Sequence, residues 1–123
     1  MNEDVESQRY RRIIDRLVDD TTHGQGQIAA DRVRRGVWVA APTPDMGEAR
    51  AINDVLARMS PEDRAVLAEV IASEFRGGIH QTLVALQEEE LPPFDRAYEG
   101  TPFHDYIGRL HGWAWPPAEV RRS

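Results

Sequence analysis

The stretch that decides the fold runs from Ser60 to Glu90 and reads SPEDRAVLAEVIASEFRGGIHQTLVALQEEE. It opens with a serine, a proline and two acids. This is a typical helix start, because the serine can cap a free amide and the acids meet the positive end of the helix dipole. Apolar residues then recur three and four positions apart, at Val66, Leu67, Val70, Ile71 and Phe75. This spacing places them on one helical face and predicts a long helix from residue 61.

Gly77 and Gly78 interrupt the apolar pattern of this helix. In a straight helix with roughly 3.6 residues per turn, the apolar stripe after the glycines, at Ile79, Leu83 and Leu86, would be rotated by more than a third of a turn from the stripe before them. Two explanations remain open: the helix bends at the glycines, or another element crosses closely against them. We expect a bent, nearly continuous helix that frays at residues 88–90, where three acids oppose the helix dipole.

The same periodicity predicts helices on both sides of this stretch. A stripe from Tyr10 to Val18 indicates a helix at about 4–20, and a weaker one follows with Gly36 as its stop. A third is expected at about 45–59, capped by Thr43 or Asp45. A fifth, at about 102–111, follows the cap-then-proline pair Thr101-Pro102 and precedes Gly112.

Because no segment alternates apolar and polar residues with a period of two, the predicted class is all-α. We expect an irregular bundle of about five helices, with an aromatic-rich C-terminal segment packed across it. A chain of 123 residues suits one domain, 1–123, with frayed ends at 1–3 and 118–123.

The composition excludes several classes of function. The chain has no cysteine, so disulfides and thiolate metal sites are absent. Its net charge is −6, and its 15 basic residues are all arginine. A phosphate backbone needs a basic face, so no nucleic-acid partner is expected. The N-terminus lacks the pattern of a secretory signal, and no apolar run approaches the ~20 residues that span a bilayer. We therefore expect a cytoplasmic protein with no membrane partner.

The candidate functional residues gather towards the C-terminus. Six of the nine aromatic residues lie between Phe94 and Trp115, in a stretch that also carries histidines, aspartates and arginines. These rings either close the core or form a pocket or interface. A Trp113 ring that fills the core would be costly to remove, whereas an exposed one would indicate a functional surface. The candidate pocket or interface residues are Glu74, His80, His104, Asp105, Arg109, His111 and Trp113.

A metal site is the alternative for part of this set. His104 and His111 are seven residues apart, about 10.5 Å along a helix, so they cannot chelate one ion together. A site would need His80, Glu74 or another acid from a facing helix alongside His104 or Asp105, and the metal candidates are His80, His104 and Asp105. Glu74 falls on the apolar stripe of its helix, where a carboxylate must pair, shift its pKa or be exposed, and we expect an arginine partner.

Four segments together resemble a family of small bacterial proteins of unknown function. They are GVW (36–38) with PTPD (42–45), LARMSPEDR (56–64), GGIH (77–80) and PPFDRAYEGTPFHDYIGRLHGWAWP (92–116). The last is the most specific. The resemblance implies a small soluble protein and no catalytic assignment, and it draws attention to His80, His104, Asp105 and Trp113.

The sequence leaves two functions open. The first is a non-catalytic helical module that binds a protein partner or another copy of itself. The alternative is a small metal-binding protein or enzyme with a cleft formed by the GGIH and PFHD segments. No nucleotide-binding, zinc-protease, calcium-binding or serine-hydrolase motif is present, which favours the non-catalytic reading with no cofactor.

Overall fold

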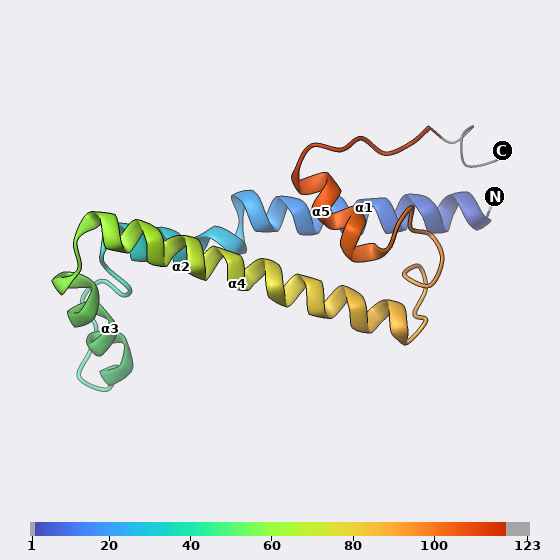
Figure 1. Ribbon diagram of the computed structural model, residues 1–123. Coiled ribbons are helices and arrows are strands. Elements are labelled where there is room, and N and C mark those ends of the chain that lie inside the picture. Colours follow the sequence, from blue (N-terminus) through green and yellow to red (C-terminus); the bar gives the residue numbers. More distant parts are fainter. Residues whose placement is uncertain (1, 118–123) are drawn as a thin grey trace. The chain divides into compact units, whose positions relative to one another are not determined.

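The structure is a computed structural model that describes residues 2–117 (Figure 1). Helices are its only regular elements within this range, so the predicted all-α class is confirmed. No helix in the described part of the chain is both long and apolar enough to cross a bilayer. The elements are α1 (Asn2–His23), α2 (Gln25–Arg35), α3 (Gly47–Arg58), α4 (Pro61–Glu88) and α5 (Pro102–Leu110).

The number of helices depends on how α1 and α2 are counted, because only Gly24 separates them. Counted as one helix interrupted at this glycine, they reduce the number in residues 2–117 to four, one fewer than the sequence predicted. Of the ends expected to fray, 1–3 and 118–123, Met1 and residues 118–123 lie outside the described residues, and residues 2 and 3 belong to the first turn of α1.

The chain divides into two compact units. The terminal unit comprises residues 1–19 and 79–123, of which 2–19 and 79–117 are described. Its core lies where α1, the C-terminal part of α4, α5 and the α4–α5 connection meet. The buried members of this core are Tyr10, Ile14, Leu83, Phe94, Ala97 and Tyr106.

The middle unit comprises residues 20–78 and has a core of its own. α2, α3 and the N-terminal part of α4 contribute its buried members, which are Ala30, Val33, Leu56, Ala68 and Ala72. Gly26 is also buried, and a Cβ atom there would lie 2.7 Å from the Thr21 carbonyl oxygen and 2.9 Å from the Phe75 ring. A glycine is therefore needed at position 26 for this packing.

Most predicted helix ends are confirmed. The Ser60 hydroxyl accepts from the Asp63 amide at 3.1 Å, and Thr101 accepts from the His104 amide at 3.1 Å. Gly36 closes α2 in the left-handed conformation, with a φ of 80°. The predicted cap of α3 is wrong: Met46 precedes the helix and provides no side-chain cap. The Thr43 hydroxyl instead donates to Asp45, which lowers the pKa of that carboxyl.

α4 is helical without interruption through Gly77 and Gly78. A Cβ atom at either glycine would meet nothing within 4 Å, so the alternative explanation, an element crossing closely against them, is wrong for the described residues. Glu90 adopts a φ of 57° just beyond the helix, and the Leu91 amide donates to the Leu86 carbonyl at 3.1 Å. A left-handed residue and this hydrogen bond together close the C-terminus of α4.

Candidate functional site

Asp105 holds the α4–α5 connection against α1 inside the terminal unit. Its Oδ2 accepts from the Tyr10 hydroxyl at 2.6 Å and from the Glu99 amide at 2.9 Å. Its Oδ1 accepts from the Gly100 amide at 3.1 Å. Only 3% of the residue is exposed. Burial, and after it the hydrogen bond to Asp105, raises the pKa of Tyr10 far above its ordinary value. Both carboxylate oxygens are thus occupied by donors from within the chain.

Arg109 fastens the segment after α5 to α1, together with Trp115. Asp15 accepts from Arg109 Nε at 2.7 Å and from the Trp115 indole nitrogen at 3.0 Å. The guanidinium groups of Arg11 and Arg109 lie 4.9 and 5.5 Å from the Trp115 ring centroid. Arg11 also donates to the Pro116 carbonyl at 3.1 Å. The C-terminal segment is therefore held to α1 by charge, hydrogen bonds and cation–π contacts.

Trp113 lies outside the core of the terminal unit, since 37% of the residue is exposed. Its side chain covers Gly108, where an added Cβ atom would lie 3.4 Å from it. The ring also meets Trp115 edge-on, with 5.2 Å between centroids. Trp115, and not Trp113, packs against the core of the terminal unit.

The three candidate histidines all lie at the surface. His80 packs against Phe103 with 3.9 Å between ring centroids, and Phe103 in turn meets His104 at 5.7 Å. His111 is turned back onto its own helix, where its Nδ1 lies 3.0 Å from the Ile107 carbonyl oxygen. The structure thus brings both His80 and His104 against the Phe103 ring.

The residues proposed for a metal site are not gathered into one. No group of three or more histidines, aspartates and glutamates in residues 2–117 is arranged to hold an ion. Asp105 points inward to Tyr10, whereas His104 is exposed and pairs with Thr101. The prediction that an arginine pairs with Glu74 is wrong as well. Glu74 is exposed, and no arginine in the described chain pairs with it.

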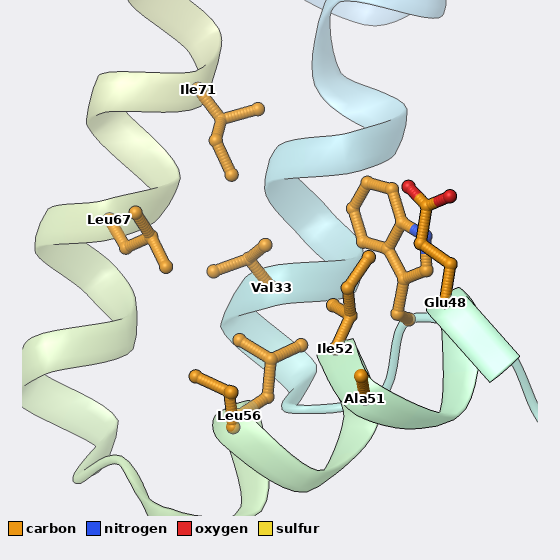
Figure 2. Close-up of a pocket in the computed structure, with 9 residues that line it drawn as sticks. Val33, Glu48, Ala51, Ile52, Leu56, Leu67 and Ile71 are labelled. Carbon is orange, nitrogen blue, oxygen red and sulfur yellow. The ribbon is translucent and has the colours of Figure 1, made fainter.

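The middle unit contains an open apolar pocket of about 400 Å³. None of the candidate residues predicted from the sequence lines it. Figure 2 shows Leu67 and Ile71 of α4 facing Val33 of α2, with Ile52 of α3 beside them. All but one of its lining side chains are apolar. The lining residues are Val33, Trp38, Glu48, Ala51, Ile52, Val55, Leu56, Leu67 and Ile71.

Asn53 positions the aromatic wall of this pocket. Its side-chain oxygen accepts from the Trp38 amide at 2.6 Å and from the Val39 amide at 3.2 Å. Its amide group donates to the Val39 carbonyl at 2.8 Å. The Arg32 guanidinium lies over the Trp38 ring, 5.6 Å from its centroid. The loop after α2 is thus fixed to α3, and it carries the indole to the pocket.

Glu48 is the one charged residue among those lining the pocket. It lies in the first turn of α3, where its charge meets the positive end of the helix dipole. The residue is exposed, as are Ala51 and Val55 on the same helix. The wall formed by α3 is therefore accessible from solvent and carries one negative charge.

The sequence of residues 2–117 matches a family described as "Family of unknown function (DUF6547)". The chain belongs to this family. The match spans both compact units, and it confirms the resemblance to a family of unknown function. Neither the curated proteins nor the solved structures gave a match.

Sequence reasoning missed both the pocket and the core role of Trp115. The pocket joins residues from three helices and one loop, and their individual patterns indicate only ordinary buried faces. The available signal was Trp38, a large aromatic residue in the short apolar run 37–41 just before a proline. A large ring of this kind is commonly packed on apolar surface, and here Trp38 packs against the core of the middle unit.

Proposed function

We propose that this member of DUF6547 is a non-catalytic protein-binding module whose pocket in the middle unit accepts apolar side chains of a partner. The observation that carries this proposal is the pocket itself: about 400 Å³, open, and lined by apolar side chains on three helices. Ligand sites in proteins have volumes of roughly 300–1,000 Å³ and predominantly apolar walls.

The position of the pocket between two helices favours a helical segment of the partner as the part that binds. The pocket lies between α3 and the N-terminal part of α4, and both helices present apolar side chains to it, such as Ile52 and Leu67. An amphipathic helix binds such a groove through residues spaced at i, i+3, i+4 and i+7. Glu48 is the one residue of the pocket lining with an acid–base side chain, and no histidine, serine or threonine accompanies it there to act as a nucleophile or proton carrier.

The proposal is tested with a labelled helical peptide of about 15 residues, long enough to form a helix. It carries leucines at i, i+3, i+4 and i+7 and glutamine elsewhere, so that its polar face is neutral. Fluorescence anisotropy measures its Kd for the full chain. Ala51→Phe places a ring in the pocket from an exposed position and should weaken binding at least about tenfold.

Ala57→Phe is the matched control, because Ala57 is exposed on α3 and does not line the pocket. It should leave the Kd within about twofold. Absence of binding, or equal weakening by both variants, would overturn the proposal. A dimer that Ala51→Phe dissociates and Ala57→Phe preserves would assign the pocket to a second copy of the chain instead.

A further inference from the structure

We infer that the partner segment is basic: a helix that fills the pocket with apolar side chains and places a lysine or arginine against Glu48. This inference rests on the proposed function and specifies the chemistry of the partner. It starts from the position of Glu48, which lines the pocket beside Ala51 and Ile52 but is exposed (Figure 2).

Glu48 is available to a partner. No other residue within 2–117 forms an ion pair or side-chain hydrogen bond with its carboxylate. A bound apolar helix would displace water from this edge of the pocket, and a carboxylate that loses water without gaining a cation is destabilising. A cationic group on the partner, next to its apolar anchor, removes this penalty.

The charge around the pocket points the same way. Over residues 25–74, which include α2, α3 and the adjoining part of α4, acids outnumber arginines by eight to six, and the excess lies on α3 and α4, with seven acids and three arginines between Asp45 and Glu74. On α2, the Arg32 guanidinium already lies over the Trp38 ring, and Arg34 is paired with Asp31 and Glu69. The side formed by α3 and α4 therefore favours a basic segment over an acidic one.

The size of the pocket limits the apolar part of the partner. A volume of about 400 Å³ leaves space for a few large side chains and not for a whole helix. The exposed Val55 lies at its edge and can pack against the body of the bound helix. The geometry thus assigns apolar anchors to the pocket and the flanking cation to Glu48.

The test uses two further peptides with the same leucine positions, one with lysine and one with glutamate at the polar positions. The lysine peptide should bind the unmodified chain more tightly than the glutamate peptide, and the difference should shrink as salt is raised. Glu48→Arg should weaken the lysine peptide by about fivefold and strengthen the glutamate peptide by a similar factor.

Asp54→Arg makes the same change in net charge on the same helix but outside the pocket lining, and it should alter either Kd by less than about twofold. Equal effects of Glu48→Arg and Asp54→Arg would overturn the role of Glu48. Equal binding of all three peptides, abolished by Ala51→Phe, would overturn the basic partner and leave the apolar pocket as the binding site. If no peptide binds, both proposals fail.

Discussion

The Tyr10 hydroxyl donates a 2.6 Å hydrogen bond to the Asp105 carboxylate across 95 positions of the sequence. This contact joins α1 to the first turn of α5, and the same carboxylate accepts two backbone amides of the preceding loop. A residue that the sequence presented as a candidate ligand is therefore a structural acceptor.

Replacement of Asp105 should make the terminal unit easier to unfold. Asp105→Ala leaves the Tyr10 hydroxyl and the Glu99 and Gly100 amides without their acceptor, and it should lower the free energy of unfolding by about 3 kcal/mol or more. Asp105→Asn keeps one acceptor oxygen and should cost less. Urea denaturation followed by circular dichroism measures both. A loss below about 1 kcal/mol for Asp105→Ala would show that these hydrogen bonds contribute little.

The raised pKa of Tyr10 predicts a loss of stability in alkaline solution. The phenol ionises near pH 10 in the unfolded chain but remains protonated in the folded one. The unfolded state therefore releases a proton that the folded state keeps, and stability falls as the pH rises above about 10, by up to about 1.4 kcal/mol per pH unit. Tyr10→Phe should lack this contribution. Parallel alkaline profiles for the two proteins would contradict the assignment.

The two C-terminal tryptophans should differ in their contribution to stability. Trp115 packs against Tyr10 at 6.0 Å between centroids and donates to Asp15. Trp115→Ala should cost about 3 kcal/mol, since it removes a large ring and leaves two arginines without their aromatic partner. Trp113→Ala should cost about 1 kcal/mol, because that ring is exposed. Thermal unfolding of both variants distinguishes them, and the reverse order would refute this packing.

Alanine substitution should lower the stability of the chain at Gly26 and raise it at Gly77 and Gly78. Gly26→Ala brings a Cβ atom to 2.8 Å from the Thr21 Cα, so backbone must move, and a loss of about 2 kcal/mol is expected. Gly77→Ala and Gly78→Ala meet open space inside α4 and should each stabilise the chain by about 0.5–1 kcal/mol. Destabilisation by Gly77→Ala or Gly78→Ala would contradict the open space around the glycine pair.

The elements that the sequence predicted well are those set by local chemistry. Ser60 and Thr101 cap their helices because each needs only a first-turn amide three residues away. Gly36 ends α2 because a left-handed residue is required there, and glycine adopts that conformation without steric cost.

The sequence-based prediction of which face of α4 is buried was wrong, because small residues form that face. Ala68 and Ala72 are buried, whereas Val66 and Val70 are exposed. Weighting the larger side chains rotated the predicted stripe towards Glu74, which lies roughly 160° around the helix from Ala72. Buried alanines mark a close approach of helices, and periodicity of large residues does not detect it.

The roles of Trp113 and Trp115 could not be separated from the sequence. Gly112 ends the helical register with a φ of 88°, so the direction of each later side chain depends on which surface the segment meets. That surface is built from Arg11 and Asp15 on α1, about a hundred positions away. The pocket escaped prediction for the same reason, since α2, α3 and α4 must come together to form it.

The most direct measurement is a titration of the ¹⁵N-labelled chain with the neutral leucine–glutamine peptide, observed at its three tryptophan indole signals. Trp38→Phe identifies the signal of the pocket wall. The Trp38 signal is expected to shift progressively to saturation, while those of Trp113 and Trp115 stay in place. A Trp38 signal unmoved at peptide concentrations that shift the other two would contradict the assignment of the pocket as the binding site.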